Sequence, residues 1–485
     1  MNFNPDESSM IFAATTGDCE PSRNDKSKIP SEEDSSGWRS RRIVILAFIL
    51  PLLLSCSAAT VQTNEPVINQ HGDFIEAFSV LDYGAAGDGV ADDTVEIQAA
   101  IDAAEAAGGG VVYIPRGTYP ISSSLVNDGQ KVRIVGAGIG QTIIKPVGTA
   151  TPFNAFTFKG TGLGSALGPL TTDFTRGDKV ADLTSASGLA VGDLLYFDST
   201  VSEPPGQDST ISMIAEISNI SNLAITVESP SPILIQTKET HAVKKWTPLN
   251  SPGLSNLTID LGTATGAVRR GVLVQDVRNG VFEHLEILNS SEAGFYSLRG
   301  FRNQYSDIKL QKCGSSKESD FTASFETYSH FSDIQSVNAT GFGPQWIACS
   351  YCFGSAVSSV GATGRGIKLH GVLQSNFVNL EGLNSASTGI AITLRTQHNN
   401  FTNLVAMGNA ASSGNDIGLW FSGQENIGNY CSGVKLTING NYDIQINSTD
   451  THNVIVGAHF DSFAKISNSG GPTNFINGSP ARPGF

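Results

Sequence analysis

The middle of the chain carries charged and titratable residues whose spacing suits proton transfer on one face of a strand. Glu326, Tyr328 and His330 alternate with other residues, so an extended conformation places their side chains on one side. Arg299 and Arg302 lie in the preceding repeat. β-Elimination at a uronic acid needs a cation to neutralise the carboxylate, a base to remove the C5 proton and an acid to protonate the leaving oxygen. We therefore predict these five residues as catalytic, with an arginine neutralising and His330 or Tyr328 exchanging protons.

Further polar residues fall in the same column of the repeat or in neighbouring turns. Tyr351, Gln374 and His398 follow Arg302 and Tyr328 when the repeats are aligned. The predicted substrate-binding residues are Tyr351, Lys368, His370, Arg395 and His398. The alternative interpretation is an ordinary solvated face that binds nothing.

Glycoside hydrolysis would instead need two carboxylates about 5 to 9.5 Å apart. Carboxylate pairs are sparse in the central repeats: Glu283 with Glu286, Asp307 with Asp333, and Glu326. Asp307 and Asp333 recur at the same position of the repeat, which favours a structural role in a turn or strand. Hydrolysis therefore ranks second to elimination.

The elements that position these residues are predicted from a repeat of about 23 to 26 residues that begins at Gly253. Each repeat reads as one coil of an all-β solenoid. Aligning the repeats stacks Phe282, Tyr305, Phe331, Phe377 and Phe401 as an inward ladder, with Gly354 interrupting it. Neutral turn residues such as Asn376 and Asn400 are expected to hydrogen-bond from coil to coil. This stacking explains why only 15% of the residues are charged, because like charges at such spacing repel.

A motif at residues 76–147 is the most specific stretch of the sequence. Phe78–Thr94 contains the motif Asp-Tyr-Gly-Ala-x-Gly-Asp-Gly-x-x-Asp-Asp-Thr, and a predicted helix follows it. Two glycine-rich motifs come after this helix: Gly-Gly-Gly-x-Val-Tyr-Ile-Pro-x-Gly-Thr-Tyr and Gly-Ala-Gly-x-Gly-x-Thr-Ile-Ile. This segment resembles the N-terminal cap and first coils of the pectate lyase superfamily, of the kind found in pectate-lyase-3 and glycoside-hydrolase-28 relatives. The resemblance implies a right-handed single-stranded parallel β-helix with an N-terminal capping helix. It implies the reaction poorly, because the superfamily includes lyases, hydrolases, mannuronan epimerases and phage tailspikes.

The chain departs from the catalytic motifs of that superfamily. Where mannuronan epimerases carry Tyr-Gly-Phe-Asp-Pro-His, residues 293–299 read Ala-Gly-Phe-Tyr-Ser-Leu-Arg, without the acid and the histidine. The paired aspartates of polygalacturonases and the closely spaced aspartates that bind calcium in pectate lyases have no counterpart. We predict no cofactor; a Ca²⁺ ion stays an alternative that no pattern supports.

The N-terminal region is typical of an exported protein. Residues 1–38 are polar and are predicted to be disordered, and residues 39–60 combine arginines, an apolar run and Leu-Ser-Cys56. This resembles a bacterial lipoprotein signal with lipidation at Cys56; a signal-anchor and a cleaved signal are the alternatives. Each places the main body outside the cytoplasm, either attached to a membrane or secreted. Cys313, Cys349, Cys352 and Cys431 are expected to be buried thiols, with a Cys349–Cys352 disulfide as the alternative.

The predicted organisation is a cap with first coils at 74–158, an inserted β-subdomain at 160–245, β-helix coils at 250–470 and a tail at 471–485. The net charge of -15 and the lack of a basic stripe argue against nucleic acid as a partner. An anionic polysaccharide would require a locally basic groove. We expect a polysaccharide lyase acting on an acidic glycan, with a glycoside hydrolase and a non-catalytic glycan-binding or tailspike-like β-helix as alternatives. The sequence predicts no oligomeric state.

Overall fold

A computed structural model describes the main body of the chain. The described residues are 77–147, 153–199, 211–237, 243–262, 270–409, 416–423, 425–460, 465–470 and 472–480. The predicted segments 1–38 and 39–60, with Cys56, lie outside them. Within the described ranges no helix is long and apolar enough to cross a membrane.

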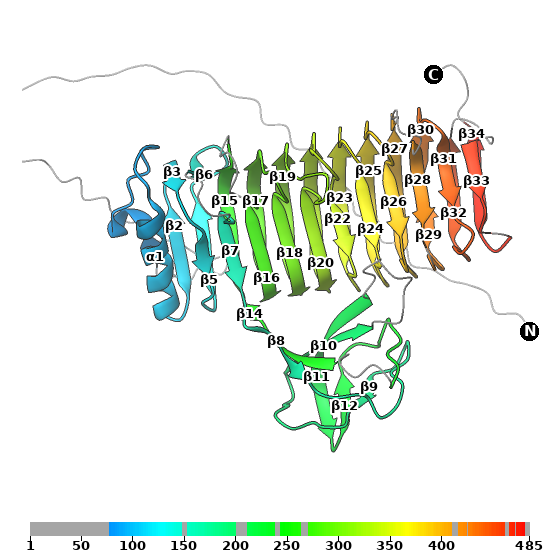
Figure 1. The fold of residues 1–485 in the computed structure, drawn as a ribbon, viewed down its shortest axis with the longest axis horizontal. Coiled ribbons are helices and arrows are strands. Elements are labelled where there is room, and N and C mark those ends of the chain that lie inside the picture. The colour runs from blue at the N-terminus through cyan, green and yellow to red at the C-terminus, as the bar shows by residue number, and fades with distance from the viewer. Residues whose placement is uncertain are drawn as a thin grey trace, which may run out of the picture. The chain divides into compact units, whose positions relative to one another are not determined.

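The coils stack along one axis, and their strands line up in two sheets of parallel strands that form a parallel β-helix (Figure 1). The 16-stranded sheet, called sheet I below, contains β1 (Ala77–Ser79), β2 (Gly110–Ile114), β3 (Gly117–Ile121), β5 (Val132–Gly136), β6 (Thr142–Pro146), β15 (Gly253–Asp260), β17 (Val281–Leu288), β19 (Gln304–Gln311), β21 (His330–Val337), β23 (Phe353–Val360), β25 (Asn376–Leu383), β27 (Asn400–Met407), β29 (Tyr430–Ser432), β30 (Lys435–Thr437), β32 (Val454–Phe460) and β34 (Phe475–Pro480). The 12-stranded sheet, sheet II, contains β4 (Leu125–Asn127), β7 (Phe156–Lys159), β14 (Leu249–Asn250), β16 (Val272–Arg278), β18 (Phe295–Phe301), β20 (Phe321–Thr327), β22 (Gln345–Ile347), β24 (Ile367–His370), β26 (Ile390–Thr393), β28 (Ile417–Ser422), β31 (Tyr442–Ile446) and β33 (Ile466–Asn468).

Each central coil contributes one strand to sheet II and, after a short turn, one strand to sheet I. The turn at Arg302, between β18 and β19, recurs in the following coils at Tyr328, Tyr351, Gln374 and His398, all with φ between 51° and 57°. We call this line of turns the corner. The column predicted from the aligned repeats is therefore confirmed.

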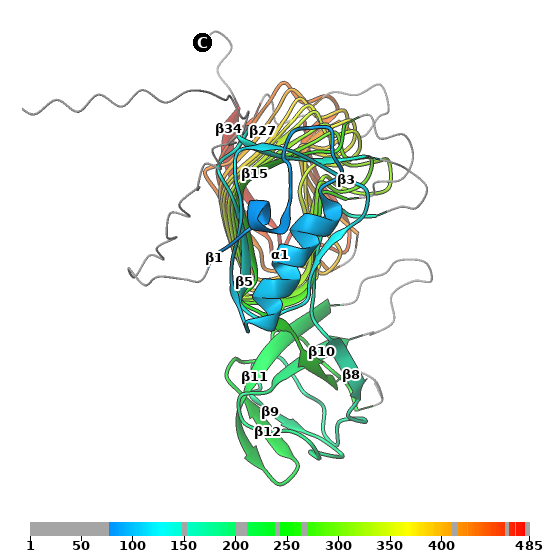
Figure 2. The same cartoon turned by 90° about the vertical axis from the view of Figure 1, so that its left-hand side faces the viewer.

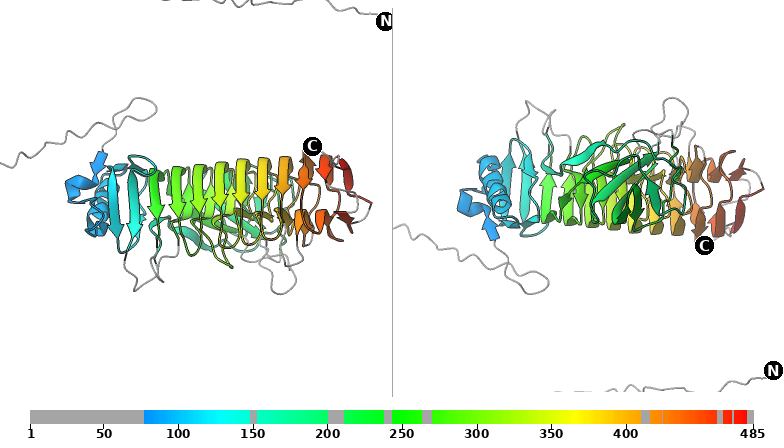
Figure 3. Two further views of the ribbon diagram at one scale, coloured as in Figure 1. Left: turned by 90° about the horizontal axis from the view of Figure 1, so that it is seen from above. Right: turned by 90° about the horizontal axis from the view of Figure 1, so that it is seen from below.

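A third sheet is inserted between β7 and β14 and is antiparallel. It contains β8 (Gly162–Ala166), β9 (Val180–Asp182), β10 (Leu194–Ser199), β11 (Ile211–Ser221), β12 (Ala224–Val227) and β13 (Val243–Thr247). This predicted β-subdomain has an apolar core of its own and lies across several coils along the corner (Figure 3).

The N-terminal end of the coils is covered by helix α1 (Thr94–Ala106) (Figure 2). Ile97, Ala100, Ile101 and Ala104 form its buried face at helical spacing, whereas Ala107, at the next position of that spacing, lies beyond the helix and is exposed. Asp92 accepts hydrogen bonds from the backbone N–H and hydroxyl of Thr94 at 3.0 and 2.5 Å. The helix thus closes the open end of the apolar interior, and Asp92 accepts one of the backbone N–H groups that lack a partner within the helix.

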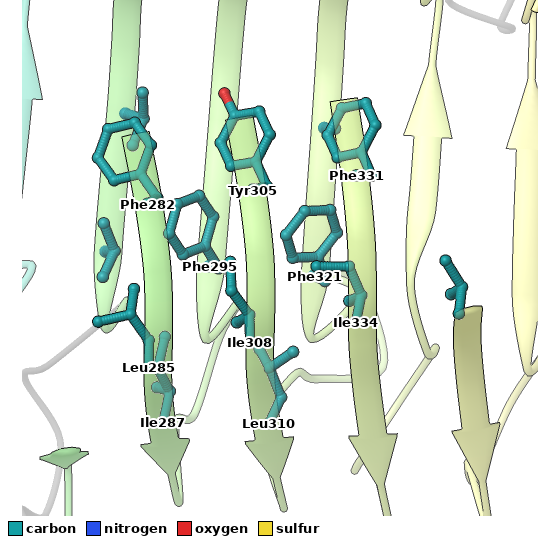
Figure 4. Close-up of a cluster of buried hydrophobic side chains, with 14 of the residues drawn as sticks. Phe282, Leu285, Ile287, Phe295, Tyr305, Ile308, Leu310, Phe321, Phe331 and Ile334 are labelled. Carbon is teal, nitrogen blue, oxygen red and sulfur yellow. The ribbon is translucent and has the colours of Figure 1, made fainter. Parts of the chain in front are cut away.

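The predicted aromatic ladder is confirmed. Sheet I pairs Phe282 with Tyr305, Tyr305 with Phe331, Phe331 with Gly354, Gly354 with Phe377 and Phe377 with Phe401. The Tyr305 and Phe331 rings stack with centroids 4.9 Å apart, and Phe321 of sheet II meets them edge-on (Figure 4). The predicted amide contact also forms, since Asn400 Nδ2 donates to Asn376 Oδ1 at 3.0 Å.

Gly354 interrupts the ladder because the Phe377 ring occupies its space. A Cβ atom at Gly354 would lie 2.2 Å from Cδ1 of Phe377. We expect Gly354→Ala to lower the free energy of unfolding by about 1 to 3 kcal/mol through overpacking, measured by urea denaturation. Adding Phe377→Leu to that variant should recover part of the loss; independent, additive effects of the two changes would contradict the packing explanation.

The four cysteines after the N-terminal region are buried free thiols, as expected. Burial raises the pKa of the Cys431 thiol well above its usual value, and that of Cys313 to about 12. The Cys313 and Cys431 thiols are therefore unreactive core residues at neutral pH.

Candidate functional site

The predicted position of Glu326 is wrong. Phe325 adopts a left-handed conformation with φ 59°, which resets the alternation of side chains along β20. As a result Glu326 points into the solenoid and is 0% exposed, while Phe325 lies outside with its ring 6.3 Å from the inserted Tyr196. Simple alternation places each of these two residues on the opposite side.

Glu326 is held in the interior by hydroxyl and amide groups. Its Oε1 accepts hydrogen bonds from Ser297 Oγ at 2.5 Å and from the Tyr305 hydroxyl at 2.8 Å, and its Oε2 accepts one from Ser329 Oγ at 2.5 Å. Burial raises the pKa of Glu326, and these hydrogen bonds oppose that shift. The carboxylate contacts Gly300 of the previous coil, where a Cβ would lie 2.1 Å from Oε2. Glu326 is thus a buried structural acid that no substrate can reach.

Arg299, also predicted to be catalytic, anchors the inserted sheet. Its Nε and Nη2 donate to the Asp276 carboxylate at 2.6 and 2.9 Å, and Trp246 Nε1 of β13 donates to the same carboxylate at 2.7 Å. Asp276 is 1% exposed and Arg299 18%. An arginine committed to a buried carboxylate is a poor partner for a substrate carboxylate, so we assign it a structural role.

Replacing Arg299 by alanine should therefore destabilise the protein far more than replacing Arg302. Arg299→Ala leaves the Asp276 charge buried without its cation and should cost about 3 kcal/mol. Arg302 is 43% exposed, so Arg302→Ala should cost less than about 1 kcal/mol. Chemical denaturation of both variants measures the difference, and equal losses would contradict this assignment.

Arg302, Tyr328 and His330 do come together, in an open cleft of about 530 Å³ at the corner. Its wall is formed by Glu228 and Ser229 of the inserted subdomain. Arg302 lies 2.8 Å from the Glu228 carboxylate and 3.5 Å from that of Glu216. Two carboxylates thus surround one cation, and this cleft lacks the positive charge that an acidic substrate would need.

Tyr351, like Arg302, contacts the inserted subdomain. Its ring stacks on Tyr328 with centroids 5.1 Å apart, and its hydroxyl donates to the Pro230 carbonyl at 2.8 Å. His398 continues this column with an exposed side chain, and partial desolvation of its ring lowers its pKa, with a smaller contribution from Arg176. Arg395 is 8% exposed and lies 3.3 Å from the Glu425 carboxylate. None of the three lies beside Lys368 in the lining of a shared cleft.

The other two predicted binding residues lie in a second cleft, on the outer face of sheet II. Lys368 and His370 alternate with Ile367 and Leu369 on β24 and lie on its outer side, where Lys368 is half-buried and His370 is only 9% exposed. Arg365 precedes them in the turn and lines the same cleft of about 310 Å³. We call Arg365, Lys368 and His370 the cation cluster. The rest of the lining is Thr393, Leu394, Ser422 and Gly423, so no described lining residue is acidic.

Neighbouring groups fix the cation cluster in place. The Arg365 guanidinium lies 5.3 Å from the ring centroid of Trp420 and 6.0 Å from that of Phe342. His370 Nδ1 lies 3.0 Å from Thr393 Oγ1, and that hydroxyl also lies 3.3 Å from the Leu369 carbonyl. When the hydroxyl proton goes to the carbonyl, Nδ1 must carry the imidazole proton and donate it to Thr393.

Burial shifts the pKa values of the basic side chains in this cleft. Burial, together with a smaller effect of the nearby Arg365 charge, lowers the pKa of Lys368 to about 8. Burial also lowers the pKa of Arg365, which nevertheless stays charged. A lysine that titrates near pH 8 beside a permanent cation can act as a proton acceptor at mildly alkaline pH.

Sequence reasoning missed Arg365, Trp420 and Glu228. The run Arg365-Gly-Ile-Lys368-Leu-His370 carried a signal, since its second half alternates around two apolar residues. Trp420 lies two coils further along the solenoid. Glu228 belongs to the inserted subdomain, and no sequence pattern indicates where that subdomain packs against the coils. Among the described residues no three His, Cys, Asp or Glu side chains gather as a metal-ligand set.

Known proteins resemble the chain in two ways. The family described as rhamnogalacturonase A/epimerase, pectate lyase-like, matches residues 77–176. Mannuronan C5-epimerase AlgE1 of Azotobacter vinelandii is 47% identical over 112 residues, which are 22% of this chain and 8% of the epimerase. Alginate lyase 7 of the same organism is 54% identical over 76 residues, 14% of this chain and 9% of the lyase. The chain thus matches less than a tenth of either relative.

The solved structures extend the likeness to most of the fold. The tailspike protein gp49 from Pseudomonas phage LKA1 matches with a TM-score of 0.51 and 16% identity, covering 79% of this chain and 71% of the tailspike. Identity at this level concerns the fold alone, and the sequence matches concern the cap and first coils. Together with the stacked parallel coils and the capping helix, these findings show a pectate-lyase-like parallel β-helix whose cap and first coils are similar in sequence to that family.

Proposed function

We propose that the protein binds an acidic, uronate-containing glycan at the cation cluster and cleaves it by β-elimination. The observation that carries the proposal is the charge of the cleft: Arg365, Lys368 and His370 face outward together, and no described residue of the lining is acidic. On a chain with a net charge of -15, such a local concentration of cations favours an anionic ligand. The cap-region likeness to epimerases and an alginate lyase supports a uronate as the sugar.

The roles follow from the charge states. Arg365 stays protonated, so it would neutralise the uronate carboxylate and make the C5 proton more acidic. Unprotonated Lys368 would remove that proton. Electrons from the broken C–H bond form the new double bond, and the glycosidic C–O bond breaks. Lys368 would then return that proton to the departing oxygen, which lies beside His370 in this arrangement. Return of a proton to the opposite face of C5 would instead epimerise the sugar without cleavage.

A product assay on polymannuronate, polyguluronate and polygalacturonate tests the proposal. Elimination produces an unsaturated uronate, detected by ultraviolet absorbance together with new reducing ends. New reducing ends without that absorbance indicate hydrolysis, and a changed sugar configuration in the NMR spectrum without new ends indicates epimerisation. Binding with no chemical change would support a tailspike-like binding module. Each of these three outcomes overturns elimination.

Hydrolysis is the second candidate function, and one observation favours it. Glu216 and Glu228 both contact Arg302, and Glu228 lines the corner cleft beside Tyr328 and His330. Two carboxylates near one open cleft are the minimum for a glycosidase. If hydrolysis is the activity, Glu228→Gln should abolish it while Lys368→Met leaves it unchanged.

The location of this activity follows from the N-terminal prediction. We propose that the β-helix works outside the cytoplasm, where glycans of this kind occur, and that lipidation of Cys56 attaches it to a membrane. Labelling cells with a radioactive fatty acid, with Cys56→Ser as the control, tests the attachment. Label that persists in the Cys56→Ser variant would contradict it.

A further inference from the structure

The outer face of sheet I carries a line of exposed side chains that begins at the corner cleft, with Gln304 and His330, and continues well beyond it. These residues open successive strands from β19 to β29 and are paired directly in the sheet: Gln304, His330, Phe353, Asn376, Asn400 and Tyr430. All six are exposed. We call them the outer strip.

Two aromatic rings stand on the strip without contributing to the core. Phe353 is 40% exposed and Tyr430 43% exposed. The Phe353 ring lies 5.9 Å from the His330 ring, and no other described aromatic ring approaches it as a partner. Three strand spacings separate Phe353 from Tyr430, or about 14 Å. Large apolar side chains kept in water at matched positions of a repeat favour a ligand.

The positions between the two rings are polar and uncharged. Asn376 and Asn400 occupy them, and their amides are joined by a hydrogen bond of 3.0 Å, which leaves further donors and acceptors toward solvent. The next outward column along the same strands is Ser306, Ser332, Ser355, Val378, Thr402 and Ser432. Neither column contains an Asp, Glu, Lys or Arg residue.

We infer that the outer strip is a second glycan-binding site, which takes one polysaccharide chain along the stack of coils. Phe353 and Tyr430 would stack against the apolar faces of sugar rings, and the amides and hydroxyls between them would bind sugar hydroxyls. The coil spacing is close to the length of one sugar unit in an extended chain, so successive units can meet successive coils. The site recognises sugar rings rather than charge, and this distinguishes it from the cation cluster.

The inference takes its ligand class from the proposed function but does not depend on catalysis. A chain must be long enough to reach both rings before it gains the full affinity. Because the strip is uncharged, its binding should change little with salt, whereas binding at the cation cluster should weaken as salt screens the charges.

The test is calorimetric titration of the full chain with oligosaccharides from dimer to octamer, prepared from polymannuronate, cellulose and mannan, at low and high salt. The mannuronate series is measured in the Lys368→Met background so that the ligand is not consumed. We expect affinity to rise with length in at least one series, and Phe353→Ala/Tyr430→Ala to weaken binding of the long chains about ten-fold at both salt concentrations. Phe353→Tyr/Tyr430→Phe should retain binding.

Tyr83→Ala is the matched control, because Tyr83 is an aromatic residue with 36% exposure at the end of the 3-10 helix Val80–Tyr83, near the cap. Absence of saturable binding in all three series, or undiminished binding by the double alanine variant, would overturn the inference. The proposed function fails separately: strip binding that persists without any elimination product would contradict only the activity at the cation cluster.

Discussion

Lys368→Met should reduce elimination on the preferred uronate polymer by about 10²- to 10⁴-fold, as expected when a general base is removed. The wild-type rate should rise with pH through an inflection near 8, because burial lowers the Lys368 pKa to about 8 and only the unprotonated amine accepts a proton. Steady-state kinetics across the pH range, with product absorbance as the signal, measure both effects.

Two further variants separate chemistry from binding. Lys368→Arg keeps a positive charge but cannot lose its proton, so it should lower kcat while changing KM little. Lys309→Met removes an exposed lysine on the outer face of sheet I and should change neither constant. If Lys368→Arg retained the wild-type rate and pH profile, Lys368 would not be the base.

Glu326→Ala should lower the free energy of unfolding by about 3 kcal/mol near neutral pH. The change leaves the buried hydroxyls of Ser297, Tyr305 and Ser329 without their shared acceptor and opens a cavity beside the aromatic ladder. Urea denaturation followed by tryptophan fluorescence measures the loss. Glu381→Ala, which removes an exposed carboxylate from β25, should change stability little.

Glu326→Gln tests the sign of the pH effect. The pKa of Glu326 is raised in the folded protein, so the part of its contribution to stability that depends on protonation is fully present below the unfolded value near 4.5 and is lost as pH rises through the folded value. Asp320 behaves alike, since burial raises its pKa from 3.8 to about 7. Glu326→Gln with Asp320→Asn should therefore flatten the fall in stability between about pH 4 and 7. A fall as steep as in the wild type would contradict this account.

Most of the fold could be predicted from the sequence because its signals are local or periodic. The motif before α1 specifies the cap, and Phe282, Tyr305 and Phe331 recur at a period that matches one coil. These residues must be buried in every coil, and a one-residue shift in strand pairing would expose them. The register of the strands is therefore strongly specified.

The site was harder to predict because the outward positions depend on exceptions to alternation. One left-handed residue at Phe325 exchanges the inside and outside positions of the next residues, and it moves Glu326 into the core. The partners of Arg299 and Arg302 lie elsewhere in sequence, at Asp276 and on the inserted strands. The sequence predicts Lys368 and His370 as binding residues in a neighbouring turn, but not Arg365, which lines the same cleft.

The most direct test of the central claim is a crystal structure of the Lys368→Met variant with a bound uronate trisaccharide. The account predicts that a uronate carboxylate lies within hydrogen-bonding distance of the Arg365 guanidinium, with the glycosidic oxygen beside His370. A trisaccharide bound in the corner cleft between Glu228 and His330, with the cation cluster empty, would contradict it.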